Sequence, residues 1–328
     1  MRILVFNCHE AWVHQLRLLG ARLDIIVGLP GRHTPGWDEA MRPLPPRSRQ
    51  VTLQEVLRAR ESYDCIITHN LTDLLDLKAF SGPRILMIHL TLEGMIAEQK
   101  PSMDSEDFRV AVHKYTGLTR THVIAVSSLK ARSWGFEQHV VPLAADPGDY
   151  FPWRGDLARG LRVSNYIVRR PRTLLWNFHQ QVFSSLPVTL VGHNPELPGA
   201  ESSRNWQHLK EILRNHRFFI HTAHPELEDG YNMATLEAMA AGLPILGNRH
   251  PTSPVTHGVS GFLSDDPVEL RGFAERLLTD QALARRMGQA AQATVLEKFS
   301  PLSFRNGMLE GIRRAQQEWS SSSSSDVR

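Results

Sequence analysis

The sequence predicts a two-domain α/β protein in which each domain is a doubly wound parallel sheet. Three observations carry this prediction. The 328 residues, 41% hydrophobic and 22% charged, suffice for two soluble domains of about 150 residues each. In the first half, short apolar runs repeatedly end in polar residues. In the second half, residues 217–247 predict a strand, a polar loop, a helix and a strand in succession, which is a βαβ unit.

Composition excludes several classes of protein. No apolar run reaches the roughly 18 residues that a membrane-spanning helix needs. The opening MRILVFN is too short for a signal peptide and predicts a strand. Two cysteines, Cys8 and Cys65, argue against a disulfide framework and favour the reducing cytoplasm. A net charge of +3 is too mild to indicate nucleic-acid binding, although it permits loose association with the inner face of an anionic membrane.

The first half alternates predicted strands with helices and loops. Strands are expected at 2–7, 23–27, 64–68, 84–88 and 121–128, and helices at 11–20, 53–60, within 95–121 and at 130–135. Between them, 28–37 is a loop by composition and 43–49 a basic, proline-rich connection. The segment 139–151 leads out of this half.

Polar residues follow the predicted strands of the first half, where an α/β sheet binds its ligands. Asn7, His9 and Trp12 follow the first strand, and His69 and His89 come directly after two later ones. We therefore expect His89 to be a site residue, in preference to a buried histidine satisfied by a nearby carbonyl. For His69 the two alternatives weigh equally. His9 is expected to be an ordinary histidine rather than a metal ligand, because its neighbour His14 brings no third ligand at a suitable spacing.

The second half continues the pattern. After the segment RVSNYIVRRPRTLLWNF at 162–178, a strand is expected at 187–192, and another within 218–220 precedes the loop 223–231. A glycine turn is expected at Gly258 and Gly261. Helices are expected at 206–214, 232–241, 267–278, 281–297 and 302–319, before a serine-rich tail at 320–328 that we expect to be disordered.

The loop and helix start at 223–237 hold the most informative residues. Asp229 and Gly230 stand just before the predicted helix, Thr235 lies in its first turn, and Glu237 follows on the same side. A glycine allows close backbone approach to a ligand, and the N–H groups at a helix start favour an anion such as phosphate. Two carboxylates flanking that position can accept hydrogen bonds from hydroxyls. This combination predicts a nucleotide sugar as ligand.

The segment DGYNMATLEAMAAGLPIL at 229–246, followed by HGVSGFL at 257–263, resembles the donor-binding signature of the retaining glycosyltransferases of GT-B fold, group 1 or family 4-like. The family has Glu where this chain has Asp229, and a Gly-Gly-x-x-Glu stretch near 250–253. The resemblance implies two Rossmann-like domains facing a cleft. It places an acceptor-side domain at 1–150, a donor domain at 151–300, and a last helix at 301–319 that packs back on the first domain.

The resemblance also implies roles for individual residues. It makes His89, Asp229, Arg170 and Arg172 catalytic, with the arginines holding the departing diphosphate and His89 directed at the donor sugar. The donor site is implied to comprise Asn165, Arg169, Gly192, Gly230, Tyr231, Asn232, Thr235, Leu236 and Glu237. On the acceptor side it implies Asn7, His9, Trp12 and His69, although the family's Gly-rich loop is replaced there.

The expected activity is transfer of a sugar from a nucleotide diphosphate sugar to a glycan, lipid-linked or small-molecule acceptor, with retention and without a metal or other cofactor. Two alternatives stay open because several family positions differ: a non-catalytic sugar-nucleotide-binding homologue and a GT-B sugar-nucleotide epimerase. No oligomeric state is predicted.

Overall fold

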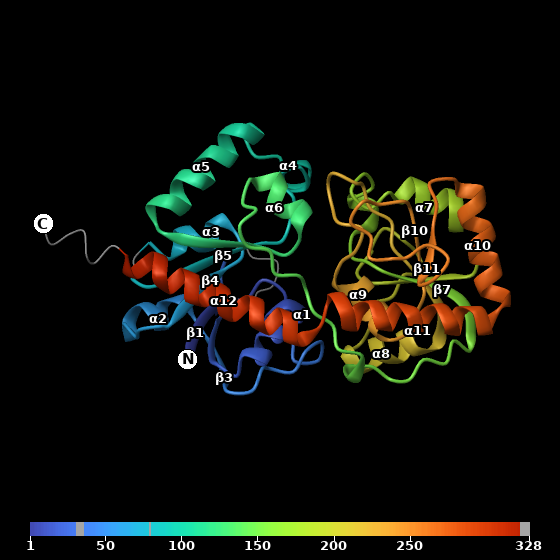
Figure 1. Cartoon of the computed structure of the whole chain (residues 1–328), viewed down its shortest axis with the longest axis horizontal. Helices are drawn as coiled ribbons and strands as arrows, with labels where there is room; N and C mark the ends of the chain where they lie inside the picture. Colours follow the sequence, from blue (N-terminus) through green and yellow to red (C-terminus); the bar gives the residue numbers. More distant parts are fainter. Residues whose placement is uncertain (31–35, 79, 322–328) are drawn as a thin grey trace, which may run out of the picture. The chain divides into compact units, whose positions relative to one another are not determined.

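The structure is a computed structural model that describes residues 1–30, 36–78 and 80–321. The chain forms two compact units: unit 1 comprises Met1–Leu143 with Pro301–Arg328, and unit 2 comprises Ala144–Ser300 (Figure 1). In the described ranges, no helix has both the length and the apolar character required to span a bilayer.

Unit 1 contains one parallel sheet of six strands in the order β3-β2-β1-β4-β5-β6. The chain winds outward from β1 through β2 to β3, returns to β4 on the other side of β1, and continues outward to β6. The strands are β1 (Arg2–Phe6), β2 (Arg22–Ile26), β3 (Ser48–Val51), β4 (Cys65–Thr68), β5 (Arg84–Ile88) and β6 (Thr121–Ala125). The helices are α1 (Glu10–Val13), η1 (His14–Leu19), α2 (Leu53–Ala59), α3 (Leu71–Asp76), α4 (Leu92–Gln99), α5 (Ser105–Leu118), α6 (Ser128–Trp134) and α12 (Pro301–Ser320).

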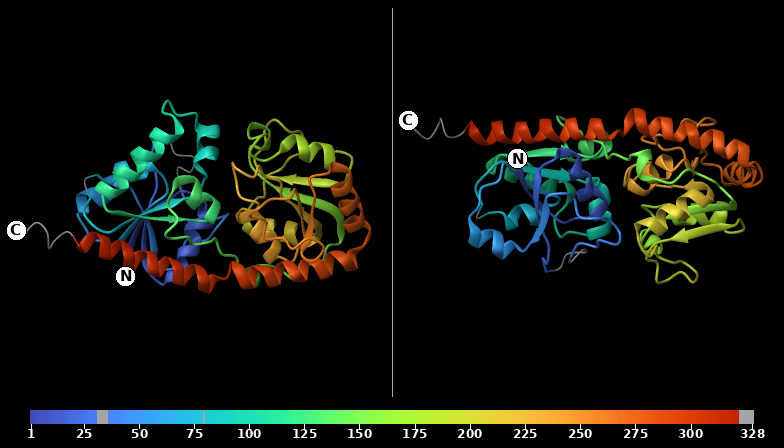
Figure 2. Two further views of the ribbon diagram at one scale, coloured as in Figure 1. Left: turned by 45° about the horizontal axis from the view of Figure 1, so that its top comes forward. Right: turned by 90° about the horizontal axis from the view of Figure 1, so that it is seen from below.

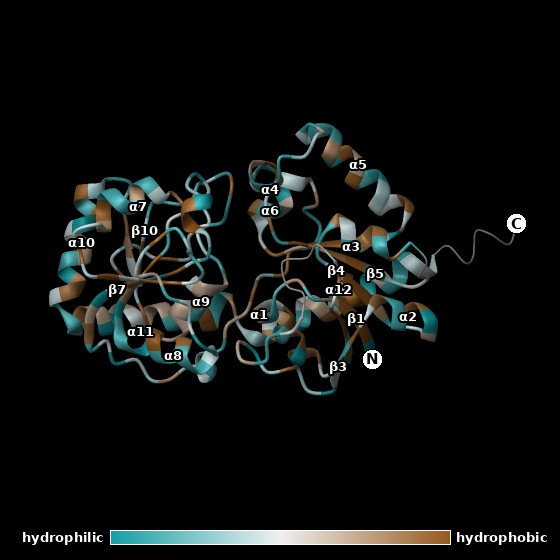
Figure 3. Cartoon of the chain, turned by 180° about the vertical axis from the view of Figure 1, so that it is seen from behind, coloured by the Kyte–Doolittle hydropathy of each residue, from teal (hydrophilic) through white to brown (hydrophobic). Residues whose placement is uncertain are grey.

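The core of unit 1 follows from its apolar strands. β4, β5 and β6 are buried along their whole length, as expected for parallel strands covered on both faces, and the middle of this sheet is largely brown in Figure 3. Helix α2 begins with a capping box between Thr52 and Glu55, which satisfies N–H groups at its start. The predicted doubly wound domain is therefore confirmed.

Helix α12 packs against β5, β6 and η1 although more than 170 residues separate it from each of them in sequence (Figure 1, Figure 2). Gly311 allows this approach, since a Cβ there would lie 2.4 Å from Ile124 Cδ1. Near the helix end, the Glu318 carboxylate contacts His122 Nδ1 at 2.7 Å. Helix α12 therefore belongs to unit 1.

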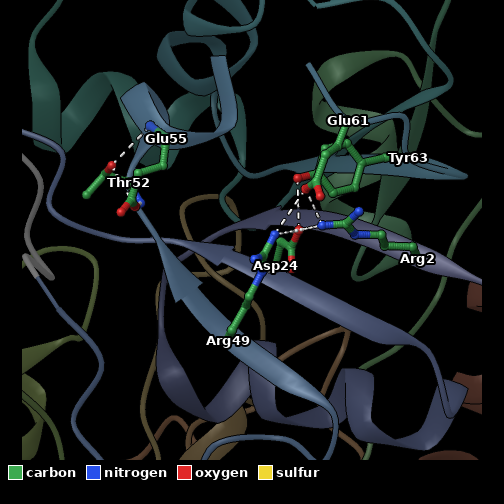
Figure 4. A network of polar contacts seen from close by, with 7 residues as sticks. All are labelled: Arg2, Asp24, Arg49, Thr52, Glu55, Glu61 and Tyr63. Atoms are coloured by element: carbon green, nitrogen blue, oxygen red, sulfur yellow. Dashed lines mark hydrogen bonds and ion pairs between the residues drawn. The ribbon is translucent and has the colours of Figure 1, made fainter. Parts of the chain in front are cut away.

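Polar side chains join β1, β2 and β3 at one edge of the sheet (Figure 4). Asp24 of β2 accepts hydrogen bonds from Arg49 Nε at 2.8 Å, from Arg2 Nη2 at 2.6 Å and from the Tyr63 hydroxyl at 2.9 Å. Glu61 contacts both arginines. Burial alone would raise the pKa of Asp24, but these hydrogen bonds outweigh it and lower the pKa to about 2. We call these five residues the Asp24 network.

Unit 2 contains a parallel sheet of five strands in the order β11-β10-β9-β7-β8. The strands are β7 (Leu157–Val163), β8 (Val188–Val191), β9 (His216–Ile220), β10 (Ile245–Gly247) and β11 (Gly261–Leu263). The helices are η2 (Pro147–Asp149), η3 (Ile167–Arg169), α7 (Trp176–Phe183), α8 (Trp206–Asn215), α9 (Met233–Ala240), α10 (Pro267–Thr279) and α11 (Gln281–Lys298). The predicted βαβ unit is confirmed as β9, α9 and β10.

Helix α9 lies at the centre of unit 2. The sequence predicts one apolar face, whereas every residue from Thr235 to Ala240 is buried, so the helix is enclosed on all sides. Its start is fixed by a capping box between Asn232 and Thr235. Gly242 follows its end with φ of +87°, a conformation that favours glycine.

Several predicted boundaries are wrong. The helix expected at 11–20 is a short α1 followed by the 3₁₀ segment η1, and β3 begins inside the expected connection 43–49. Gly261 begins β11 instead of lying in a turn, and α3 and α7 were not predicted. Helix α12 ends at Ser320, one residue beyond the expected 319. The rest of the predicted tail, from residue 322 on, lies outside the described residues, as does part of the loop expected at 28–37.

Candidate functional site

The sheet of unit 2 reverses its winding direction between β7 and β9. From β7 the chain moves to β8 on one side, and β9 then pairs on the other side of β7. In open α/β sheets a crevice forms at this switch point, beyond the carboxyl ends of the two strands. Two loops leave the strands there, 164–175 after β7 and 221–231 after β9. They contain Asn165, Arg169, Gly230 and Tyr231 of the predicted donor site, together with the predicted catalytic residues Asp229, Arg170 and Arg172.

Arg162, near the end of β7, forms hydrogen bonds to residues of both loops. Its fully buried guanidinium donates to Thr222 Oγ1 at 2.7 Å and to the Leu174 carbonyl at 2.9 Å, and it contacts His179 Nδ1 at 3.1 Å. Burial lowers the pKa of Arg162 to about 9, so the side chain is still charged at neutral pH. Because a buried charge is costly unless it is hydrogen-bonded, Arg162 must keep its partners in both loops, and this fixes the two loops relative to each other.

The loop 221–231 is held by hydrogen bonds rather than left to solvent. The Asn248 carboxamide accepts the Ala223 N–H and donates to the Ala223 carbonyl, each at 3.0 Å. The Thr252 hydroxyl accepts the Gly230 N–H at 2.8 Å. His221 Nε2 contacts the Asp229 carbonyl at 3.2 Å. Most of the loop is buried, so its polar groups require these partners. The loop is therefore a preformed element.

Gly230 is required by a neighbouring turn. A Cβ at this position would lie 2.8 Å from His250 Nδ1 and 2.8 Å from the Ser253 backbone nitrogen. The sequence predicts that this glycine allows close approach of a ligand. In the structure the close approach is to the turn at 250–253, the segment that replaces the family's Gly-Gly-x-x-Glu stretch.

Asp229 and Glu237 are both buried, with 1% and 6% of their surface exposed. Asp229 precedes α9, and its backbone N–H donates to the Glu228 carboxylate at 3.0 Å. Glu237 lies in the second turn of the same helix. The structure thus places two carboxylic side chains in the interior around the start of one helix, a costly arrangement that favours a functional role.

The other predicted residues around α9 have structural partners. The Asn232 N–H donates to Thr235 Oγ1 at 3.3 Å within the capping box, so this N–H is engaged inside the chain. The Tyr231 ring packs against Phe299 with centroids 5.0 Å apart. Leu236 is fully buried, and its side chain belongs to the core. These residues shape the helix start.

The three predicted arginines differ in their surroundings. Arg170 is partly exposed, and its Nη2 lies 3.8 Å from Glu228 Oε2, which connects the basic loop to the loop carrying Asp229. Arg172 is exposed and forms no ion pair with a described residue. Arg169 donates from Nε to Glu196 at 2.5 Å and lies over the Tyr166 ring. Arg170 and Arg172 are therefore better placed than Arg169 to meet an anion.

Asn165 and Gly192 lie just after the ends of β7 and β8, where the two loops pack against each other. The Asn165 carboxamide oxygen accepts the His193 N–H at 2.8 Å. Gly192 has φ of +133°, and a Cβ there would lie 2.3 Å from the Ser164 carbonyl oxygen. This glycine is required by backbone packing whether or not a nucleoside lies against it.

The sheet of unit 1 has its own switch point, between β1 and β4. His69 follows β4, His89 follows the adjacent β5, and the two rings share a hydrogen bond of 2.9 Å between His69 Nδ1 and His89 Nε2. The Trp12 ring meets both edge-on, with centroids 4.7 Å and 5.3 Å away. Burial lowers the pKa of His69 to about 3 and that of His89 well below its usual value, so both are neutral at pH 7.

The remaining predicted acceptor-side residues lie on the loop after β1. The Asn7 carboxamide donates to the Gly36 carbonyl at 2.8 Å. His9 is exposed and precedes α1 without a side-chain cap bond. The structure therefore brings Trp12, His69 and His89 together, whereas Asn7 is buried and bonds to the Gly36 carbonyl and His9 acts on His89 electrostatically.

Sequence reasoning missed the groups that support the site. Arg162 was detectable as a charge inside an apolar strand, and Asn248 as a polar residue directly after β10. Cys8, which lies near His69 and His89, was considered only as a disulfide candidate. The pairing of Thr252 with Gly230 had no local signal, because 22 residues separate them.

The segment that carries these loops is similar to known proteins. A family model described as glycosyl transferase-like matches residues 169–302, which contain the basic loop, the loop 221–231 and α9. N-acetyl-alpha-D-glucosaminyl L-malate synthase of Bacillus anthracis is 36% identical over 76 residues, or 22% of this chain and 20% of that protein. The chain thus aligns with about a fifth of the length of the curated relatives it matches.

Solved structures are similar over nearly the whole chain. Anabaena Alr3699/HepE, solved with UDP and glucose, has a TM-score of 0.69 at 15% identity and covers 95% of this chain and 99% of its own. WaaG, a glycosyltransferase involved in lipopolysaccharide biosynthesis, has a TM-score of 0.61 at 11% identity and covers 94% and 99%. The predicted GT-B fold is confirmed, and the matches support the predicted resemblance to glycosyltransferases.

Proposed function

We propose that this chain is a glycosyltransferase that transfers a sugar from a nucleotide diphosphate sugar to a hydroxyl-bearing acceptor. The observation that carries the proposal is the switch point of unit 2, where Asp229 and Glu237 are buried around one helix start and Arg170 approaches the same loop through Glu228. Buried carboxylates beside a flexible cation suit a ligand that has hydroxyls at both ends and phosphates between them. The glycosyltransferase-like match over 169–302 covers this segment.

The residues take distinct parts in the proposed reaction. Glu237 accepts hydrogen bonds from the ribose hydroxyls, and Asp229 accepts them from the transferred sugar. Arg170 and Arg172 bind the diphosphate and stabilise the negative charge that grows on it as the bond to the sugar breaks. A guanidinium has five N–H donors, so Arg170 can bind phosphate oxygens without giving up its long contact with Glu228. Following the family resemblance, we assign His89 to the sugar.

The proposed step requires no metal, because the arginines supply the positive charge at the leaving group. The bond between the anomeric carbon and the phosphate oxygen breaks, and a bond from that carbon to the acceptor oxygen forms. The acceptor proton passes to the leaving phosphate. If both oxygens use the same face of the sugar, the configuration is retained, as the resemblance implies.

We propose the cytoplasm as the setting, since the two cysteines are free thiols.

UDP-sugars are the first donors to test, because HepE was solved with UDP and glucose. Purified protein is incubated with UDP-, GDP-, ADP- and dTDP-sugars and an acceptor panel, and released nucleotide and glycosylated product are measured together. Asp229→Ala is expected to lower turnover ~100-fold, or about 2.7 kcal/mol of transition-state stabilisation. Glu226→Ala is the matched control, because Glu226 is exposed in the same loop. Binding without turnover would instead identify a non-catalytic homologue, and donor conversion without acceptor an epimerase.

A further inference from the structure

Three metal-ligating side chains meet at the switch point of unit 1. Cys8 follows β1, His69 follows β4 and His89 follows β5, and these strands are neighbours in the sheet. One ligand atom from each residue lies within 4.8 Å of the other two. We propose that Cys8, His69 and His89 form a binding site for a thiophilic divalent cation, represented by Zn²⁺, and that occupancy of this site inhibits the proposed transfer reaction.

The donor set suits such an ion. A thiolate and two imidazoles are the ligands preferred by zinc, and three protein ligands leave a fourth tetrahedral position for water. With metal–ligand distances of about 2.0–2.3 Å, ligand atoms on one tetrahedral ion lie about 3.3–3.6 Å apart. The imidazole nitrogens, now 2.9 Å apart, need to separate by a few tenths of an ångström, and the sulfur needs to approach by at most about 1.5 Å. Side-chain rotations are sufficient for such shifts.

The scaffold holds the ligands in place. His69 is buried, its backbone N–H donates to Asp73 Oδ2 at 3.0 Å, and the Trp12 ring packs on both histidines. Cys8 and His89 are partly exposed, which leaves a path for an ion. Sites built on strand ends are more exact than sites on free loops.

The surrounding charges act in both directions. Asp73 interacts electrostatically with Cys8 and favours a cation, whereas Lys130 interacts with His89 and opposes one. On binding, the Cys8 thiol releases its proton and the hydrogen bond between the two imidazoles is exchanged for two metal–nitrogen bonds. No electron is transferred.

Inhibition follows from the assignment of His89, and this part alone rests on the proposed function. An imidazole bound to a metal cannot at the same time donate or accept a hydrogen bond through that nitrogen with the donor sugar. Zinc is therefore expected to reduce transfer by wild-type protein and by Cys65→Ser, but not to reduce further the transfer by Cys8→Ser.

The test uses tag-free full-length protein stripped with a chelator and titrated with Co²⁺ as a spectroscopic probe for Zn²⁺. We expect one Co²⁺ per chain with a thiolate-to-cobalt charge-transfer band and tetrahedral d–d absorption. Cys8→Ser should lose the band and bind at least about 10-fold more weakly, since even loss of a group that only supports a ligand costs that much. Cys65→Ser is the matched control, because Cys65 is buried within β4.

The outcomes are distinct. Absence of a thiolate band in wild-type protein, or its loss in Cys65→Ser with retention in Cys8→Ser, would overturn the metal site. Circular dichroism and a second variant, Cys8→Ala, establish that the lost band does not reflect unfolding. If the band appears as expected but no donor is turned over by metal-free protein, the metal site stands and the proposed function fails.

Discussion

Replacement of Gly230 by alanine tests whether the loop 221–231 is fixed by its neighbouring turn. The added Cβ would lie 2.8 Å from His250 Nδ1, 2.8 Å from the Ser253 nitrogen and 2.9 Å from His250 Cβ, closer than real Cβ contacts. The turn cannot move freely, because the Ser253 N–H donates to the His250 carbonyl at 3.0 Å and Thr252 binds the Gly230 N–H. One of these hydrogen bonds must lengthen, or the loop must shift.

The expected cost combines two opposing effects. Overpacking of a dense site costs about 1–3 kcal/mol, whereas exchange of glycine for alanine recovers about 0.4–1 kcal/mol by restricting the unfolded chain. The net expectation is a destabilisation of about 1–2 kcal/mol. At about 2–4 °C per kcal/mol for a unit of this size, the midpoint of thermal unfolding should fall by about 2–8 °C. Binding of nucleoside diphosphate should weaken in parallel, because the loop contains Glu228, which lies beside the proposed diphosphate ligand Arg170.

Differential scanning fluorimetry and calorimetric binding measurements are made on the same protein samples. Gly272→Ala is the control, because Gly272 is an exposed helical residue whose added Cβ would meet nothing within 4 Å. It should leave the midpoint unchanged or raise it slightly. The reasoning is refuted if Gly230→Ala keeps the wild-type midpoint while losing nucleotide binding, since the glycine would then serve ligand approach and not the turn.

Two further predictions concern charges. Because the Asp24 network holds the pKa of Asp24 at about 2, below the usual 3.8, its stabilisation is present above about pH 4 and is lost as the pH falls toward 2. Asp24→Asn should therefore lower the free energy of unfolding by about 2 kcal/mol at neutral pH and flatten its dependence on acid pH, as measured by urea titration. An unchanged acid profile in this variant would count against the stabilising role of the Asp24 network. Arg170→Ala and Arg172→Ala should each lower kcat/KM by ~10- to 100-fold while costing no more than about 1 kcal/mol of stability. Wild-type kcat/KM in both would exclude them as diphosphate ligands.

The fold was predictable because its signals are local. The apolar runs that became β5 and β9, the capping residue Asp266 of α10, and the glycine after α9 all lie within a few residues of the element they define. The wrong boundaries occurred where local signals were weak or conflicting. β3 follows two prolines and contains Arg49, whose charge is satisfied by residues distant in sequence, Asp24 on the adjacent strand and Glu61.

The candidate site was predictable in position but not in its supporting contacts. Asp229 and Glu237 were found because their spacing on one helix start is visible in the sequence. The role of Gly230 was not, because the atoms that require a glycine belong to residues 250–253. Likewise, Cys8 and His69 are 61 residues apart in sequence, and only the order of strands in the sheet brings them together. Such contacts depend on the fold as a whole.

The most direct test of the central claim is the affinity for nucleoside diphosphates. Isothermal titration of wild-type protein with UDP, GDP, ADP, dTDP and CMP should identify at least one diphosphate that binds at one site per chain. Glu237→Gln should weaken that binding at least about 10-fold, because a charged acceptor for the ribose hydroxyls is lost. The exposed Glu226→Gln should bind as the wild type does. If no nucleotide binds, or if Glu226→Gln loses as much affinity as Glu237→Gln, the proposed donor site is wrong.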